Sequence, residues 1–414
     1  MTAAERTRGC PVGHYAWASG DHPPMTGFRQ FDREDREPVF YTTDAAGYHV
    51  FTEQEAIAEG MQRTDLFSSH AIEPITPNPE YRWIPEMLDP PEHTQWRRLL
   101  APMFTPARAA AMTDDIRAQA TVLIDELVDD GHCDFMSQFA RKYPTAIFLR
   151  MMGLPLSELD KFLAWEYTIL HGNDETDPKR ERAAQAMGEV ARYFAGVIAE
   201  ARKDDSGKTD IISAAVRWEI DGAPITDADL LSLCTLIFVA GLDTVAAQLS
   251  FIMYTLATDT DLRQRILDDP AVIPSAVEEF LRVYGIVQCG RRVTEDIVFR
   301  GCPLKRGEMV LFPLAAAGRD PQQYEDPSTI DFDRGRVRHI SFGAGPHRCL
   351  GSHLARVELI VGLEEWHRRI PHYGLAAGQT ILEHHSGVYG LNNLPLTWSG
   401  SATYERAGSH GRNP

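Results

Sequence analysis

The sequence predicts a mainly α-helical fold with small β-sheets at its edge. Residues 92–282 carry a mainly helical pattern of apolar positions, whereas residues 291–315 alternate like strands and are broken by turns. A further helix is predicted from Leu350 to about Arg369. No internal repeat or low-complexity linker divides the sequence, so we expect one domain over residues 1–414.

The first 91 residues are predicted to contain little helix. Within residues 1–70, "PVFYTT" and "YHVFT" flank "DAAG", which is the pattern of a β-hairpin among loops. Residues 71–91 hold six prolines, and proline cannot continue a helix or a sheet ladder. We therefore expect an ordered loop there.

Leu230–Ala257 is a long apolar segment preceded by Thr226 and Asp229 in the spacing of a capping box. Its length would suffice to cross a bilayer of about 30 Å. However, Asp243 and Thr244 lie at its middle, and a charge at the centre of a membrane span costs about 3 kcal/mol. We therefore predict the central helix of a soluble protein and no membrane partner.

Composition narrows the class of protein further. The 41 basic and 59 acidic residues give a net charge of −18, which argues against a nucleic-acid partner. The six cysteines form no CxxC pair, and so few in a chain of this length predict no disulfide framework. The first 17 residues carry no apolar stretch, so we expect no signal peptide and a cytoplasmic location.

The stretch "SFGAGPHRCLGSHLA" at 341–355 places Cys349 directly before a predicted helix. Backbone N–H groups at a helix start favour a thiolate, the form of cysteine that binds metal. Glycines allow close approach of a flat partner, and Phe342 would shield the sulfur. A structural cysteine beside turn glycines is the alternative. The joint spacing of Phe342, Gly345, Cys349 and Gly351 favours the metal ligand.

Two weaker patterns accompany this loop. "AGLDT" at 240–244 brings a glycine and two polar residues into the apolar helix. It fits either a helix bend in which Thr244 bonds back to a carbonyl, or a groove with a proton-handling pair. Glu279 and Arg282 lie three residues apart on one helix face, a spacing that also occurs on many solvated helices.

Taken in order, these three patterns resemble the cytochrome P-450 superfamily. "LDPPEHTQWRRLL", "GRRVTED" and "HLARVELIVGLEEWHRRIP" are most similar to its bacterial camphor-hydroxylase type, over residues from about 40 to 398. The resemblance implies the P-450 fold with a single haem-thiolate domain. It makes 71–91 the substrate-access loop, 230–257 the central helix, 341–351 the haem-binding loop and 400–414 a disordered tail.

The resemblance also implies a haem b cofactor, dioxygen as co-substrate, and a role for each motif residue. Cys349 becomes the axial ligand of the iron, while Thr244 hydrogen-bonds oxygen and Asp243 relays protons. Glu279, Arg282 and Arg334 become a structural group. The remaining haem-binding residues are Phe342, Gly345, Gly351, Ala240 and Gly241, with His93, Arg97, Arg291 and His347 as propionate partners. Arg292 is the alternative to Arg291.

The implied substrate is a compact apolar terpenoid or norisoprenoid with one carbonyl or ether oxygen. Tyr81 is a candidate donor to that oxygen, and packing within the loop is its alternative role. The other pocket residues implied are Trp83, Leu236, Val287, Val388 and Tyr389. Cys289 and the residues before Tyr81 depart from the camphor-type pattern, so camphor itself is not implied.

The haem domain accounts for the chain, so we expect electrons from an external 2Fe–2S ferredoxin with its NAD(P)H-dependent reductase. No acidic residue lies between Asp333 and Glu358, and an acidic partner could dock on the arginines near Cys349. The docking residues predicted are Arg98, Arg336, Arg338, Arg348 and Arg356. The expected protein is a monomer. The alternatives are a non-catalytic haem-thiolate sensor, a peroxide-driven peroxygenase and a haem-free thiol enzyme.

Overall fold

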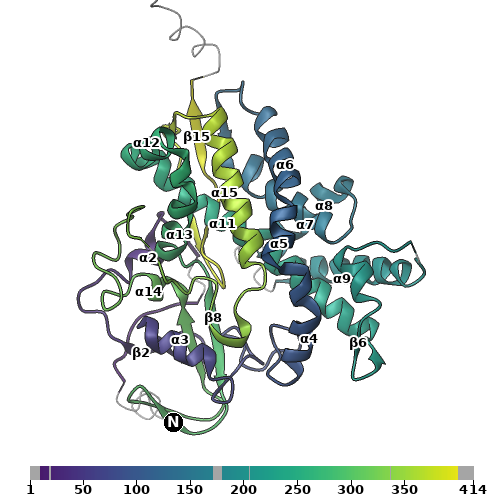
Figure 1. The fold of residues 1–414 in the computed structure, drawn as a ribbon. Helices are drawn as coiled ribbons and strands as arrows, with labels where there is room; N and C mark the ends of the chain where they lie inside the picture. The colour runs from purple at the N-terminus through teal and green to yellow at the C-terminus, as the bar shows by residue number, and fades with distance from the viewer. Residues whose placement is uncertain (1–9, 18–19, 171–179, 205, 336, 400–414) are drawn as a thin grey trace, which may run out of the picture.

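The computed structural model describes residues 10–17, 20–170, 180–204, 206–335 and 337–399. Helices form most of the molecule, and a five-stranded sheet containing β2 and β8 lies at the lower left in Figure 1. This arrangement confirms the predicted fold class. The tail predicted at 400–414 lies outside the described residues.

The α-helices are α2 (Thr26–Arg29), α3 (Gln54–Gln62), α4 (Glu92–Leu100), α5 (Pro106–Ala111), α6 (Thr113–Asp125), α7 (Lys142–Met151), α8 (Leu159–Leu170), α9 (Glu181–Ala201), α10 (Ile211–Ala215), α11 (Asp227–Thr258), α12 (Thr260–Asp268), α13 (Ile273–Val283), α14 (Leu314–Gly318) and α15 (Ser352–Arg369). Shorter helical turns are η1 (Ala101–Phe104), η2 (Met136–Ala140), η3 (Leu156–Glu158), η4 (Pro270–Val272) and η5 (Gly345–His347).

The strands are β1 (Gly20–His22), β2 (Val39–Thr42), β3 (Tyr48–Phe51), β4 (Phe67–Ser68), β5 (His132–Asp134), β6 (Glu219–Ile220), β7 (Ala223–Pro224), β8 (Gln288–Val293), β9 (Ile297–Phe299), β10 (Cys302–Leu304), β11 (Met309–Pro313), β12 (Tyr373–Leu375), β13 (Glu383–His385), β14 (Gly390–Leu391) and β15 (Pro395–Trp398). The largest sheet has the order β2-β3-β11-β8-β4, in which β11 runs parallel to β3 and the other neighbours are antiparallel.

The predicted long apolar helix is α11. The Thr226 hydroxyl accepts a hydrogen bond from the Asp229 N–H at 3.1 Å, and so caps the helix as expected. Within the described residues, α11 is long and apolar enough to span a membrane, but 56% of its most apolar window is buried inside the molecule. Such burial is what a core helix of a large soluble protein shows.

Two hydrophobic clusters meet along α11. One packs its first half, up to Leu242, against α7, α8 and α9, and the other packs its second half, from Val245, against α13, α15 and the large sheet. Thr244 lies at the junction between the two clusters. A junction between separately packed clusters is where a fold can leave space for a ligand.

Several elements were not anticipated from the sequence. Helix α3 lies in the N-terminal region that was expected to hold loops and strands, and it packs beside η5. Strand β13 pairs with β1, and β15 pairs with β5, so both have partners distant in the chain. Cys10 and Cys302 form a disulfide across 292 residues, although cysteine spacing predicted no framework. Pairing over such separations leaves no local pattern.

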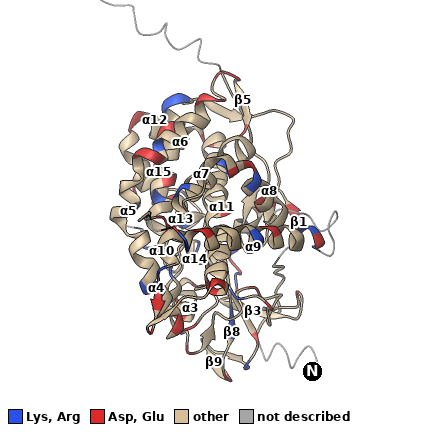
Figure 2. Ribbon diagram, turned by 90° about the vertical axis from the view of Figure 1, so that its right-hand side faces the viewer, with Lys and Arg blue, Asp and Glu red and all other residues tan. Residues whose placement is uncertain are grey.

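Charged residues of both signs are interspersed over the outer helices, for example α8 and α12 in Figure 2.

Candidate active site

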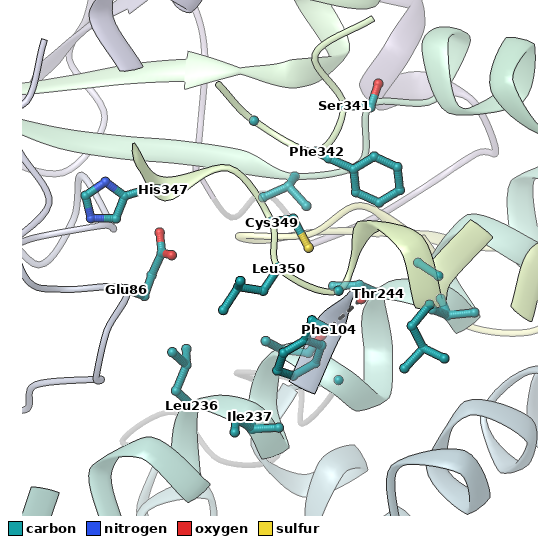
Figure 3. A pocket seen from close by; sticks show the side chains of 18 of the residues that line it. Glu86, Phe104, Leu236, Ile237, Thr244, Ser341, Phe342, His347, Cys349 and Leu350 are labelled. Atoms are coloured by element: carbon teal, nitrogen blue, oxygen red, sulfur yellow. Dashed lines mark hydrogen bonds between the residues drawn. The ribbon is translucent and has the colours of Figure 1, made fainter. Parts of the chain in front are cut away.

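One cavity of about 350 Å³ lies at the junction of the two clusters (Figure 3). Its walls come from α4, α7, α11, β8 and the segment before α15. The expected site residues that line it are Arg97, Leu236, Ala240, Gly241, Thr244, Val287, Arg291, Phe342, His347, Cys349 and Gly351. The expected residues outside the lining are Tyr81, Trp83, His93, Asp243, Gly345, Val388 and Tyr389.

Cys349 projects its sulfur into this cavity from the loop before α15 (Figure 3). Its N–H donates to the Phe342 carbonyl at 2.8 Å, which fixes the loop just ahead of the helix. Burial raises the pKa of the Cys349 thiol, whereas the Gly351 N–H and the guanidinium groups of Arg97 and Arg348 lower it. The latter three groups are those that would stabilise a thiolate bound to a metal.

Two positions of this loop, 345 and 351, are occupied by glycine for different structural reasons. Gly345 has φ +68°, and a Cβ there would lie 2.6 Å from the Met61 carbonyl oxygen of α3. Glycine is therefore required at 345 by the turn and by the close approach of α3. Gly351 instead lines the cavity, so a side chain there would take up cavity space.

A basic, partly unsatisfied cluster lies at the edge of the cavity, where His347 lines it and His93 packs against His347. The His93 and His347 rings lie 3.9 Å apart between centroids. Burial, and then neighbouring arginines, lower the pKa of His93 to about 4 and that of His347 to about 2, so both rings are neutral at pH 7. Both His93 ring nitrogens and Nδ1 of His347 are buried without a hydrogen-bond partner. Such orphaned groups are costly unless a ligand pairs with them.

Two arginines flank these histidines. Arg97 donates to the Arg348 carbonyl at 2.6 Å and so joins α4 to the Cys349 loop. Arg291 is 2% exposed, and its Nη2 lies 3.8 Å from a carboxylate oxygen of Glu86. Of the adjacent pair in β8, Arg291 and not Arg292 lines the cavity. The unpaired imidazole nitrogens and the two guanidinium groups can bind the two carboxylates of haem, and a cysteine sulfur can bind its iron. These residues therefore fit haem.

The "AGLDT" motif faces the same cavity from α11, which is continuous through it. The Thr244 hydroxyl donates to the Ala240 carbonyl at 3.0 Å, the back-bonded arrangement that the sequence left open. A Cβ on Gly241 would lie 3.2 Å from the Phe148 ring. Asp243 is 4% exposed and lies behind the cavity wall.

Glu279, Arg282 and Arg334 are brought together beneath the loop. Arg282 donates to both Glu279 oxygens at 2.7 and 2.8 Å, and Arg334 donates to one of them at 3.0 Å. Arg282 is fully buried and also donates to three backbone carbonyls, those of Gly318, Pro327 and Thr329. The group therefore pins the chain that leads into the Cys349 loop.

The substrate side agrees less well with expectation. Tyr81 is 37% exposed, and its pKa is raised first by partial burial and then by the Glu73 carboxylate, to which its hydroxyl donates a hydrogen bond. The Tyr389 hydroxyl is buried and lies 2.6 Å from that of Tyr15. The structure therefore engages both hydroxyls away from the cavity. Trp83 packs against Tyr81 at 5.0 Å, and Val388 forms a backbone bridge to Val287.

Other cavity residues were not anticipated from the sequence. They are Glu86, Phe104, Phe148, Ile237, Gln248, Ser341, Leu350 and Glu358. Burial raises the pKa of the Glu86 carboxyl, while Arg291 and Arg97 lower it. Apolar residues such as Phe104 and Phe148 follow ordinary helical patterns, so nothing in the sequence distinguishes them from core residues.

The expected docking arginines have separate environments. Arg98, Arg338 and Arg348 are exposed. The Arg356 guanidinium donates to Glu278 at 2.9 Å and lies 4.6 Å from the centre of the Phe342 ring, so its charge is already paired. Arg336 lies outside the described residues.

Comparisons with known proteins identify the family. A family model described as Cytochrome P450 matches residues 169–366. A curated relative, "Probable cytochrome P450 127A1" of Sinorhizobium fredii, is 36% identical over 372 residues and covers 88% of each chain. The chain belongs to the cytochrome P450 family. Vitamin D(3) 25-hydroxylase of Pseudonocardia autotrophica is 31% identical, covering 87% of this chain and 88% of its own.

Solved structures agree with this assignment. That of CYP101J2 superposes with a TM-score of 0.85 at 29% identity, over 96% of this chain and all of its own. That of CYP101C1 gives 0.84 at 25% identity, over 94% and 97%. The chain is therefore a cytochrome P450 monooxygenase that uses haem b, dioxygen and electrons from a redox partner.

Proposed function

We propose that this P450 hydroxylates a compact, apolar terpenoid or norisoprenoid, using dioxygen and electrons from an external ferredoxin. The observation that carries the proposal is that the Cys349 sulfur and the Thr244 hydroxyl line the same cavity, whose other walls are mainly apolar. In such a cavity apolar contacts provide affinity and a few polar groups set orientation.

Haem bound in the cavity supplies the iron at which dioxygen is activated. Cys349 would hold that iron as thiolate, and Arg97, Arg291, His93 and His347 would hold the two carboxylates of the macrocycle. Thr244, in the cavity lining, carries a proton on its Oγ1. Asp243, buried behind that wall, passes protons toward it from the direction of solvent.

The apolar residues on the substrate side exclude water and orient the substrate by shape. Leu236, Phe104 and Ile237 belong to this wall (Figure 3). Val287 lines the same cavity. Since Tyr81 and Tyr389 bond elsewhere, shape and not a tyrosine hydrogen bond is the main support for selecting the substrate.

The electron donor is proposed from charge. Arg98 on α4, Arg348 next to Cys349, and Arg338 are exposed cations in a chain of net charge −18. An acidic 2Fe–2S ferredoxin, reduced by an NAD(P)H-dependent reductase, is the partner whose charge complements them. We place the protein in the cytoplasm as a monomer, where such a ferredoxin and its reductase operate.

The test is a carbon-monoxide difference spectrum followed by a screen of cyclic terpenoids for spin-state shifts. We expect the thiolate-type absorption band in the wild type and its loss in Cys349→Ser. Product should then form with ferredoxin, reductase and NADH. Product with peroxide alone would favour the peroxygenase, and haem binding with no product under either condition would favour the sensor.

A further inference from the structure

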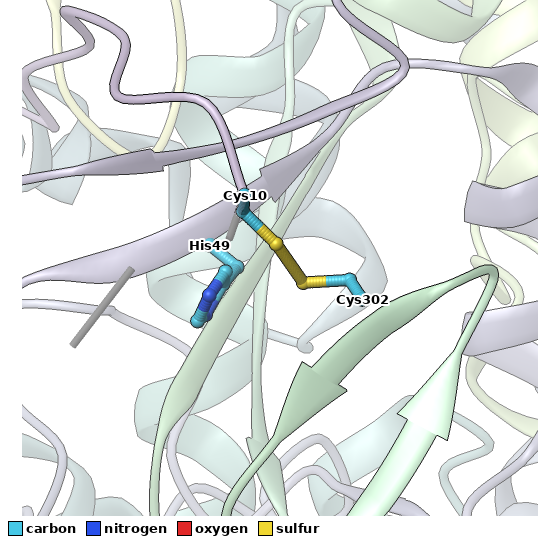
Figure 4. Close-up of side chains that lie close together, drawn as sticks. All are labelled: Cys10, His49 and Cys302. Carbon is cyan, nitrogen blue, oxygen red and sulfur yellow. A yellow bond between two sulfur atoms is a disulfide. The ribbon is translucent and has the colours of Figure 1, made fainter. Parts of the chain in front are cut away.

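A second cluster of metal-ligating side chains lies outside the cavity. Cys10 in the N-terminal segment, His49 on β3 and Cys302 on β10 come together although 292 residues separate the two cysteines. One ligand atom of each lies within 4.8 Å of the other two (Figure 4). None of these residues contributes to the P450 cavity.

The cluster is enclosed and its positions are fixed by strand pairing. The exposed fractions of Cys10, His49 and Cys302 are 9%, 0% and 1%. His49 lies opposite Tyr41 on β2 and Val310 on β11, and its ring packs edge-on against Tyr41 at 5.0 Å. Cys302 begins β10, which pairs with β9. Two of the donors are therefore presented by sheets and not by free loops.

The two cysteines are joined as a disulfide in the structure. A cytoplasmic thiol such as glutathione reduces a disulfide by exchange: two thiol molecules are oxidised to their own disulfide, and the protein gains two cysteine thiols. Reduction leaves two sulfur donors and one imidazole in a small, water-poor space. Thiolate and imidazole together are the donors that zinc prefers.

We propose that the reduced cluster of Cys10, His49 and Cys302 is a binding site for Zn²⁺. Two thiolates balance the charge of a divalent ion, so the buried complex is neutral, whereas Cu⁺ would leave a buried negative charge. Binding releases the two thiol protons to solvent. Zinc with three protein ligands keeps its fourth position for water, which can enter beside Cys10, the most exposed of the three.

The bound ion would attach the N-terminal segment to β3 and to the β9–β10 hairpin. The segment already touches the sheet through a bridge between Val12 and Tyr41. Zinc would thus hold the same three elements that the disulfide holds, in the reducing compartment where the disulfide opens. This inference concerns a site separate from the haem and does not depend on the substrate proposed above.

The experiment uses the full-length, haem-containing protein with its cysteines kept reduced and any non-haem metal removed. This protein is titrated with Zn²⁺ in competition with a chromophoric chelator. We expect about one Zn²⁺ per chain in the wild type. Binding should weaken by at least about tenfold in Cys10→Ser and in His49→Ala, since even partners of metal ligands contribute that much. Cys234→Ala, which removes a buried cysteine of α11, is the matched control and should bind as the wild type does.

His49→Ala separates the metal site from the disulfide, because it keeps both cysteines. After oxidation it should still form the Cys10–Cys302 disulfide, detected by peptide mapping, while binding zinc weakly when reduced. In the wild type, oxidised glutathione should form the disulfide and release Zn²⁺ together, with two glutathione thiolates as the other product. Equal zinc binding by wild type and His49→Ala, or no binding by the wild type, would overturn the proposal. The haem spectrum should stay unchanged throughout.

Discussion

The two sides of the cavity are built by different forces. The thiolate side, residues 341–351 with α13 and α15, is fixed by directional contacts: the pair Glu279–Arg282, its bonds to carbonyls, and the Cys349 N–H to Phe342. The substrate side, where Phe104, Leu236, Ile237 and Val287 line the cavity, is formed largely by apolar packing. Directional networks specify one geometry, whereas packing tolerates substitution of similar volume. Chemistry can therefore stay fixed while the substrate changes.

The largest test of this contrast removes the network on the thiolate side. Arg282→Ala leaves the buried Glu279 with Arg334 as its remaining cation. It also removes the hydrogen-bond donor of three backbone carbonyls. We expect the free energy of unfolding to fall by about 3–5 kcal/mol and haem retention to drop, measured by urea unfolding and by the haem-to-protein absorbance ratio. Arg265→Ala breaks an exposed pair with Asp333 and should cost less than about 1 kcal/mol. Equal effects would show that burial of the network is unimportant.

The next test lies at the junction of the two sides. Thr244→Ala should keep electron consumption but divert it to peroxide, because the proton donor in the cavity is lost. A positioned proton donor contributes about 10²–10⁴-fold, and water entering the site would recover part of that, so we expect product per NADH to fall about tenfold to a hundredfold. NADH, peroxide and product are measured together.

The control for that variant is Thr235→Ala. Thr235 makes the same kind of back-bond on α11, to Leu231 at 2.8 Å, but does not line the cavity. It should leave coupling unchanged. If Thr244→Ala were as well coupled as the control, the hydroxyl would have only the helix-bonding role.

Glu358 on α15 is an exception to the well-paired thiolate side. Its Oε2 is buried without a partner, and burial raises the pKa of its carboxyl from 4.5 to about 8. Between pH 4.5 and about 8 the Glu358 carboxyl keeps its proton in the folded protein but loses it in the unfolded chain. The free energy of unfolding should therefore fall as pH rises through this window and then level off.

Glu358→Gln should remove this fall, and its advantage over the wild type should grow through that window to a few kcal/mol (on the order of 1.4 kcal/mol per pKa unit). Chemical unfolding followed by circular dichroism at several pH values measures it. Glu219→Gln, at an exposed position, should track the wild type. If the free energies of unfolding of the wild type and Glu358→Gln changed with pH in parallel, the Glu358 carboxyl would be in contact with water and the prediction would be wrong.

The same contrast explains what the sequence could predict. Cys349, Thr244 and the Glu279–Arg282 pair lie in short motifs, since each depends on neighbours within a turn or two of chain. Gly345 also depends on Met61 of α3, far earlier in the chain, and the loop motif gives no sign of that contact. Tyr81 and Tyr389 were placed by resemblance, but their hydroxyls are engaged by Glu73 and Tyr15. Tyr15 lies far from Tyr389 in the chain, and Glu73 precedes Tyr81 in a loop without regular periodicity, so sequence spacing encodes neither contact.

A smaller effect is expected from trimming the substrate side. Leu236→Ala should weaken binding of an apolar terpenoid by about tenfold, the cost of about 1–2 kcal/mol of lost apolar contact, and leave the carbon-monoxide spectrum intact. Titration of the spin-state shift measures the change. Leu231→Ala, which truncates a leucine on the same helix outside the cavity lining, should bind as the wild type does. Loss of haem in Leu236→Ala would contradict the separation of the two sides.

The smallest effect concerns the outer face near the Cys349 loop. Arg98 is exposed beside Arg97, whose bond to the Arg348 carbonyl brings α4 next to that loop. Arg98→Gln should slow reduction by an acidic ferredoxin several-fold at low salt, and the difference should vanish at high salt because surface charges are then screened. Stopped-flow reduction at several ionic strengths measures both rates, with Arg29→Gln on α2 as an exposed control. A wild-type rate that does not depend on salt would rule out electrostatic docking and leave the exposed arginines with a role in solubility alone.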